Sequence, residues 1–158
     1  MPRQPLQNPI LWIHGEAVGP ANPALLAWPQ RPAVFVLDRE LLAGGGSSNA
    51  SHGPLSLKRI GFLVECLLEL PVTIRCGAVA SEVVAFAERH GADGVVTSQA
   101  VDPRFQRIAA QIEATLPLQV LPVPSFVPPG AGQPQDLARF GRYWRRAEPL
   151  VWQLWDRP

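Results

Sequence analysis

Polar residues that could bind a ligand directly follow the short apolar runs of this chain. They are His14, Glu16, Asp38, Arg39, Ser98, Gln99 and Asp102, with Ser81 in a further loop. In a parallel sheet, ligands bind outside the carboxyl ends of the strands, near the point where the strand order reverses. The sequence therefore predicts a binding cleft lined by these residues. Asp38, Ser81 and Asp102 fit equally well as helix caps and turn formers.

Motifs for catalysis or metal binding are not found in the sequence. Gly44-Gly45-Gly46 lacks the glycine and lysine spacing of a phosphate-binding loop and the glycine spacing of a dinucleotide site. His14, His52 and His90 are scattered, and the ligand groupings that zinc requires are missing. Because no nucleophile can be paired with a base, the sequence predicts no enzymatic chemistry and no catalytic residue.

A second group of residues with recognisable chemistry lies in the C-terminal tail. Phe140-Gly141-Arg142-Tyr143-Trp144-Arg145-Arg146 mixes aromatic residues with arginine, and Trp152 and Trp155 follow. Such a mixture can pack over the chain's own apolar surface, form a protein interface or, less favoured here, stack and pair with nucleic acid. If the tail binds a protein partner or a second copy, the expected contact residues are Arg142, Tyr143, Trp144, Arg145, Trp152 and Trp155.

The composition is that of an ordinary globular protein. Of 158 residues, 47% are hydrophobic and 17% are charged, which suffices for a single packed core. The net charge of +1 gives no overall field that would attract nucleic acid or an anionic membrane. Cys66 and Cys76 lack Cys-x-x-Cys spacing, so we expect reduced thiols in a cytoplasmic protein that does not enter a membrane.

Five apolar runs alternate with helical patterns, which is typical of a parallel sheet covered by helices on both faces. The predicted strands are 10–13, 33–37, 72–74, 94–97 and 118–121. Helices are expected to begin at Asn22-Pro23, near Leu55, at Ser81 and at Asp102-Pro103. The helix over 55–70 is expected to be buried except for a narrow stripe of Lys58, Glu65 and Glu69. The fold class is a doubly wound α/β domain with a five-stranded parallel sheet over residues 1–130, followed by a tail over 131–158.

Several segments resemble the photolyase/cryptochrome family, in the same order along the chain. Ile10-Leu11-Trp12-Ile13 and then Asn22-Pro23-Ala24-Leu25 resemble its opening strand and helix. Residues 34–43 are similar to its second strand and turn, and residues 59–67 to its Arg-x-x-Phe-Leu-x-Glu-Ser-Leu helix. Phe140-Gly141-Arg142-Tyr143-Trp144 resembles an interdomain segment. The resemblance implies the Rossmann-like, antenna-type N-terminal domain of that family.

The chain departs from the family pattern where function would lie. His14-Gly15-Glu16-Ala17-Val18 stands in place of an Arg-Arg-Asp-Leu-Arg segment that helps to shape the antenna region. Gly77-Ala78-Val79 stands in place of Gly-Asp-Pro. The helical domain that carries FAD and the lesion pocket is absent from this sequence. The resemblance therefore implies neither photolyase activity nor FAD binding by this chain alone.

The expected function is accordingly that of a stand-alone, non-catalytic domain that acts as a binding or protein-interaction module. Its partner could be a second copy or a separate flavin-binding subunit. The alternative is binding of an antenna-type chromophore (a folate or deazaflavin) or a nucleotide in the cleft at the ends of the strands, against which the loss of the arginine-rich segment argues. An enzyme with an unrecognised site on this scaffold is a weaker third hypothesis.

Overall fold

The computed structural model describes residues 5–43, 55–124 and 139–155. The chain divides into two units, Met1–Val123 and Pro124–Pro158, and each is considered by itself. The predicted domain boundary after residue 130 and the glycine-rich segment 44–46 lie outside the described residues.

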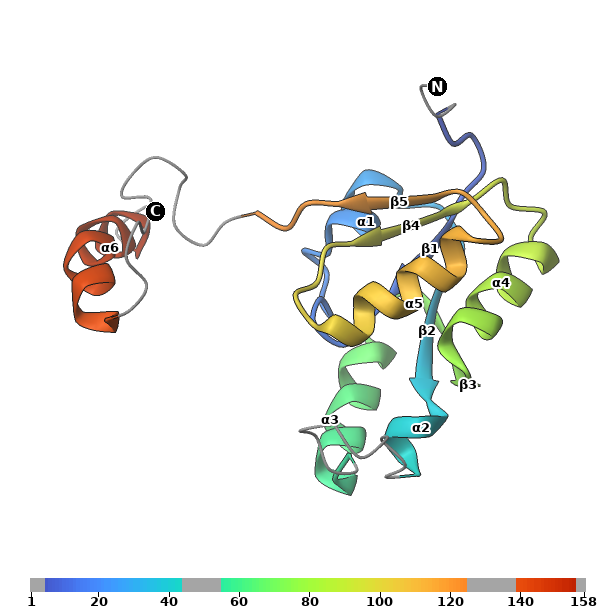
Figure 1. The fold of residues 1–158 in the computed structure, drawn as a ribbon, viewed down its shortest axis with the longest axis horizontal. Helices are drawn as coiled ribbons and strands as arrows, with labels where there is room; N and C mark the ends of the chain where they lie inside the picture. Colours follow the sequence, from blue (N-terminus) through green and yellow to red (C-terminus); the bar gives the residue numbers. More distant parts are fainter. Residues whose placement is uncertain (1–4, 44–54, 125–138, 156–158) are drawn as a thin grey trace. The chain divides into compact units, whose positions relative to one another are not determined.

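A five-stranded parallel sheet forms the centre of the first unit (Figure 1). Its strands, in chain order, are β1 (Ile10–Ile13), β2 (Ala33–Asp38), β3 (Val72–Gly77), β4 (Val95–Ser98) and β5 (Leu118–Leu121). In space the order is β3-β2-β1-β4-β5. The chain therefore moves outward from β1 to β3 and then returns to place β4 on the other side of β1. This order confirms the doubly wound, Rossmann-like fold, with its reversal point between β1 and β4.

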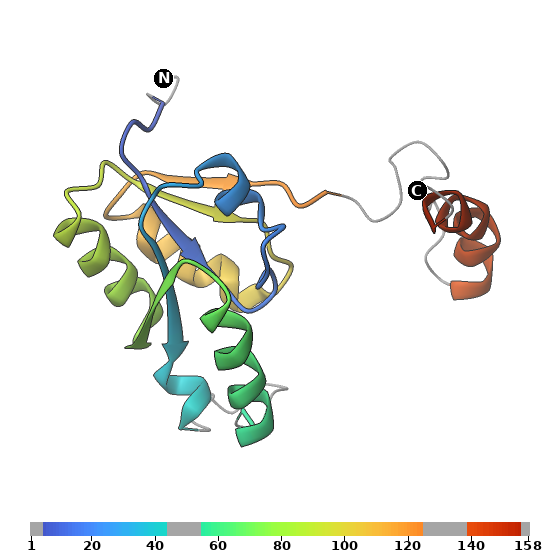
Figure 2. The same ribbon diagram turned by 180° about the vertical axis from the view of Figure 1, so that it is seen from behind.

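Helices cover both faces of the sheet (Figure 2). Successive residues of a strand point to opposite faces. Ile10 and Trp12 pack with residues of α4 (Val79–Arg89) and α5 (Pro103–Glu113), whereas Leu11 and Ile13 pack with residues of α1 (Pro23–Ala27) and α3 (Leu57–Leu68). All four residues of β1 are buried, as expected for a central strand of a parallel sheet.

Local capping signals position several of these helices as predicted. The Asn22 side chain accepts hydrogen bonds from the backbone of Ala24 and Leu25 and caps α1, with Pro23 in the first turn. Asp102 caps α5 in the same way, by accepting from the Arg104 amide. After α4, Gly91 adopts a left-handed conformation with φ of 58°, which a glycine allows at little cost.

Three details of the helices differ from the sequence predictions. The prediction that Ser81 caps α4 is wrong, because the extended backbone at Ala78 starts the helix at Val79 and leaves Ser81 inside its first turn. A short helix, α2 (Arg39–Leu42), follows β2 directly and was not predicted. The expectation that α3 is almost wholly buried is also wrong. Only Leu67 of α3 is buried, because this helix lies at the periphery of the unit and its element contacts are chiefly with the edge strand β3.

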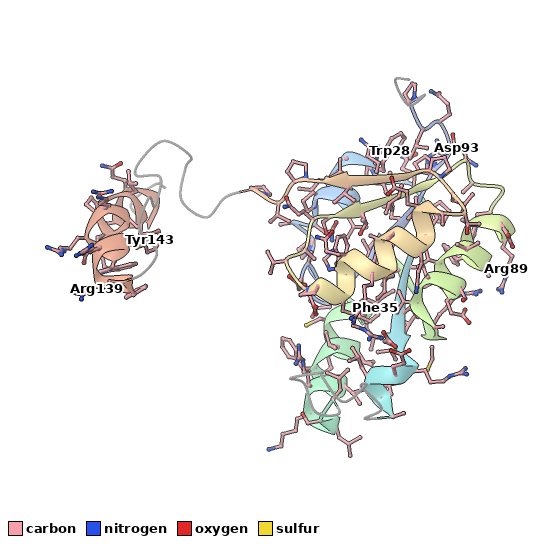
Figure 3. The ribbon with its side chains drawn as sticks, viewed as in Figure 1. Trp28, Phe35, Arg89, Asp93, Arg139 and Tyr143 are labelled. Carbon is pink, nitrogen blue, oxygen red and sulfur yellow. The ribbon has the colours of Figure 1, made fainter. Side chains whose placement is uncertain are left out.

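The second unit contains the helix α6 (Phe140–Trp155), which agrees with the helical spacing of the tail. Its aromatic rings pack against one another at the start of the helix, where Phe140 stacks on Trp144 with ring centres 5.9 Å apart. Arg139, immediately before the helix, and Tyr143, one turn later, are labelled in Figure 3. Pro149 lies inside the helix and lacks the amide hydrogen that would bond to the preceding turn.

Candidate functional site

The reversal point of the sheet brings together four of the predicted site residues. His14 follows β1, Glu16 lies two residues later, Ser98 ends β4, and Asp102 precedes α5. They meet because the carboxyl ends of the adjacent strands β1 and β4 lie at the same edge of the sheet. The structure thus brings these four residues together at one edge of the sheet, where their contacts are mostly with one another.

His14 bridges the two central strands. Its Nε2 lies 2.9 Å from the Ser98 carbonyl oxygen, and its Nδ1 lies 3.3 Å from the Glu16 amide nitrogen. Since a carbonyl can only accept and an amide N–H can only donate, this geometry selects a neutral imidazole with its proton on Nε2. The ring also packs against Phe105, with centres 5.1 Å apart. Burial lowers the pKa of His14 below 6.5, against the opposing effects of the Ser98 bond and the Glu16 charge.

The same geometry bears on serine chemistry. Ser98 Oγ lies 3.1 Å from His14 Nε2, a distance compatible with a nucleophile and its base. Nε2 nevertheless carries the proton that is donated to the Ser98 carbonyl, so it is not available to remove the hydroxyl proton. Ser98 is also completely buried, and Asn22 Nδ2 lies 3.4 Å from its Oγ. The pair therefore ties β1 to β4 and is not arranged as a catalytic pair.

Glu16 occupies the position where an anionic ligand would be expected in this fold. Its two carboxylate oxygens accept hydrogen bonds from the backbone amides of Val101 and Asp102, at 3.1 and 3.2 Å. These amides precede α5, and helix N-termini attract negative charge through their unpaired N–H groups and their dipole. The chain supplies that negative charge itself, so an external phosphate or carboxylate would have to displace Glu16.

Asp38 is held by an arginine that the sequence reasoning missed. Arg104 Nε lies 3.0 Å from Asp38 Oδ2, and its Nη2 contacts both Asp38 Oδ2 and, at 3.0 Å, Glu40 Oε2. Burial lowers the pKa of Arg104, but the hydrogen bonds and charges of the two carboxylates outweigh that effect and raise it. A signal was present in the sequence, because an arginine in the first turn of a helix opposes the dipole and calls for a carboxylate nearby.

Arg39 and Gln99 do not join this network. Arg39 is exposed in the first turn of α2. Gln99 is exposed as well, and its backbone amide donates to the Leu121 carbonyl at 2.7 Å, which extends the pairing of β4 with β5. Gln99 also lines a hollow of about 530 Å³ formed by α5 and β5, together with Phe105, Gln106, Ala109, Ala110, Glu113, Leu118, Val120 and Pro122.

Metal binding and membrane crossing find no support in the part of the chain that the structure describes. Among residues 5–43, 55–124 and 139–155, no three His, Cys, Asp or Glu side chains are grouped so that they could hold a metal ion. In the same ranges, no helix has the length and apolar character needed to cross a bilayer.

The tail residues predicted to contact a partner lie on two sides of α6. At helical spacing, Phe140, Tyr143 and Trp144 share one side with Ala147, Leu150 and Val151, while Arg142, Arg145 and Arg146 lie on the other. Among the aromatic residues of α6 up to position 152, Phe140 and Trp152 are exposed, at 71% and 54%, whereas Tyr143 and Trp144 are half-buried. Trp152 follows Arg145 by seven residues and so lies on the arginine side. Trp155 is the last residue of the helix.

No protein-family model matches the chain, and no curated protein matches it.

The environment of His14 predicts a pH dependence of stability. The pKa of His14 is 6.5 in the unfolded chain and lower in the folded state. At a pH between these two pKa values, the unfolded chain binds a proton that the folded chain does not. The contribution of neutral His14 to the free energy of unfolding is complete above the pKa of the unfolded state and is lost as the pH falls through the pKa of the folded state. We expect the urea midpoint of a His14→Gln variant to fall less than that of the unmodified protein between about pH 7.5 and about pH 5.

Nuclear magnetic resonance provides the direct check on this residue. The His14 ring should titrate with a midpoint below 6.5. Glu16→Gln should lower this midpoint further, because it removes the carboxylate charge that raises the His14 pKa in the unmodified protein. A midpoint at or above 6.5 would contradict the lowering of the His14 pKa by burial.

The Asp38–Arg104 pair should contribute strongly to stability. Asp38 is only 7% exposed, so Arg104→Met leaves a buried carboxylate without its cationic partner. We expect a loss of about 2 to 3 kcal/mol in the free energy of unfolding, measured by urea denaturation. The matched control is Arg107→Met, an exposed arginine one turn along α5, which should cost less than about 0.5 kcal/mol. The double variant Asp38→Asn/Arg104→Met should lose less than the sum of its parts, and strict additivity would show that the pair is not coupled.

Proposed function

We propose that this chain is a photolyase-related α/β domain without catalytic activity, and that it acts as a protein-interaction module through α6. The observation that carries the proposal is the surface of α6, where Phe140 and Trp152 remain exposed on a helix that also presents Arg145 and Arg146 to solvent. Trp152 lies on the arginine side of the helix, and an exposed tryptophan beside arginine is characteristic of protein interfaces, in which Trp, Tyr and Arg contribute most of the binding energy.

The arrangement at the sheet edge supports a non-catalytic role. His14, Glu16 and Asp38 each engage another group of the chain, at the place where proteins of this fold class bind ligands. The residues that would otherwise act on a substrate thus hold loops and strands together. The partner that the family resemblance implies is a separate flavin-binding helical protein. Cys66 and Cys76 are both free thiols, which supports a reducing, cytoplasmic compartment.

Site-specific photo-crosslinking in the host cell tests the interaction. A benzophenone amino acid in place of Trp152 should give one dominant product, and mass spectrometry of that product identifies the partner. The control carries the same group in place of Arg89, which is exposed on α4 in the first unit. If both positions give the same products, α6 is not the contact surface. If the crosslinked partner holds no flavin, the interaction through α6 stands, but the assignment of the partner as a flavin-binding protein is contradicted.

A second candidate function is chromophore binding, and one observation favours it. The hollow between α5 and β5, at about 530 Å³, falls within the range of about 300 to 1,000 Å³ that small-molecule sites occupy. It contains Gln99 but none of the other predicted cleft residues, so a folate or deazaflavin would lie beside the sheet edge and not over the reversal point.

The absorption spectrum of the protein purified from its own host tests this candidate. A stoichiometric band from the near-ultraviolet into the blue is expected if the hollow holds a chromophore, and Ala110→Trp should abolish it by filling the hollow. Ala114→Trp is the control. Ala114 directly follows α5, one turn after Ala110, and it is exposed but does not line the hollow. A flat spectrum above the tryptophan band in folded protein would contradict chromophore binding.

A further inference from the structure

Helix α3 lies at the periphery of the first unit (Figure 1, Figure 2). A row of apolar residues that is exposed at both ends runs along it. Leu57 and Leu68, the first and last residues of the helix, are 86% and 74% exposed. Gly61 and Val64 lie between them on the same side, because the successive spacings of four, three and four residues follow the helical repeat. We call Leu57, Gly61, Val64 and Leu68 the α3 row.

The α3 row is not the side by which the helix joins its own unit. That side carries Leu67, which is 1% exposed and belongs to the core, with the half-buried Ile60 and Leu63. At about 100° per residue these three lie about 70° to 130° from the centre of the row, on the flank next to the half-buried Val64. The row therefore leaves two leucines in solvent on a well-formed helix, at the spacing that helices use to pack against each other.

The row is complementary to a second copy of itself. Its spacing is the same when read from either end of the helix, so two antiparallel copies related by a two-fold axis place Leu57 opposite Leu68 and Gly61 opposite Val64. A large residue thus meets a small one at the centre. The space above Gly61 is open, since a Cβ atom built there would have no atom within 4 Å. The Val64 side chain of a second copy could enter that space.

The charges beside the row match in the same arrangement. Lys58, Glu65 and Glu69 are all exposed along one flank of the row. In the antiparallel pair this flank faces the same flank of the second copy, and Lys58 falls between the levels of the opposing Glu65 and Glu69. A parallel two-fold pair would instead set these flanks on opposite sides of the interface, where Lys58 of one copy does not face Glu65 or Glu69 of the other.

We propose that α3 forms an antiparallel, two-fold interface with α3 of a second copy of this chain, centred between Gly61 and Val64. The proposal does not depend on the function assigned to α6. The flank carries one lysine and two glutamates, a net negative charge that disfavours an anionic lipid or a nucleic acid as the occupant, whereas its lysine can pair with the glutamates of a second copy.

Charge reversal tests both the surface and the register. Sedimentation equilibrium over about micromolar to millimolar concentrations should show a monomer–dimer equilibrium for the unmodified chain. Lys58→Glu places three carboxylates along each flank and should weaken dimerisation by at least about tenfold, as should Glu65→Lys/Glu69→Lys, which places three lysines there. A mixture of these two variants should form a heterodimer about as tightly as the unmodified chain dimerises, because every opposing charge is then of opposite sign.

Apolar substitutions on the same helix complete the test. Leu68→Gln should also weaken dimerisation by about tenfold or more, and Gly61→Leu should do so by filling the space that Val64 needs. Phe62→Gln is the matched control: Phe62 is 64% exposed on α3 but lies off the row, so dimerisation should persist. Circular dichroism should report a folded chain for each variant, since none of these residues is buried.

Three outcomes would overturn the proposal. They are a chain that stays monomeric throughout, a dimer unaffected by Leu68→Gln, and charge variants that fail to combine. An association with lipid vesicles or with an unrelated protein that depends on Leu57 and Leu68, without self-association, would assign the row to another occupant. Crosslinking from position 152 tests α6, and sedimentation tests α3. A negative result in one experiment therefore does not decide the other proposal.

Discussion

The need to pair polar groups at the edge of a buried sheet governs the first unit. β1 is covered on both faces, and the strands on either side end in groups that lie close to the apolar core. A buried polar group there, such as the Asp38 carboxylate or the Ser98 carbonyl, loses much of its hydration and must be compensated by the protein. Glu16 satisfies two backbone amides before α5, His14 satisfies the Ser98 carbonyl, and Arg104 neutralises Asp38. Each of these contacts involves a side chain, and together they connect β1, β2, β4 and α5.

The compensation has a chemical consequence. A ligand-binding edge in this fold class keeps amides, carboxylates or a histidine available for an incoming molecule. Here a ligand would have to compete with Glu16, whose effective concentration at the α5 amides is high because it belongs to the same chain. The imidazole of His14 is held in one tautomer by a donor on one side and an acceptor on the other, so a proton added to Nδ1 would face an amide N–H. The edge is therefore better suited to holding the fold than to exchanging protons.

The sequence predicted those features of the fold that depend on neighbouring residues. Asn22-Pro23 and Asp102-Pro103 set the starts of two helices, Gly91 marks the end of a third, and the fifth strand is found at the predicted residues. The cleft residues His14, Glu16, Ser98 and Asp102 were also correctly placed at one edge, because that placement follows from the topology of parallel sheets. Their pairing could not be predicted in the same way, since it depends on side-chain distances across 84 to 86 residues of sequence.

The error over α3 has the same origin and is informative. Its sequence is apolar on most of its circumference, and burial was the natural inference for such a helix. The structure places it against an edge strand, which can cover one side of a helix but not two. A single exposed apolar residue is ordinary on a protein surface. Leu57 and Leu68, however, lie in one row, and the space above Gly61 between them is unoccupied. The excess of apolar character in α3 is explained if the second side of the helix is buried by another molecule, and the palindromic spacing of the row makes an identical molecule the simplest fit.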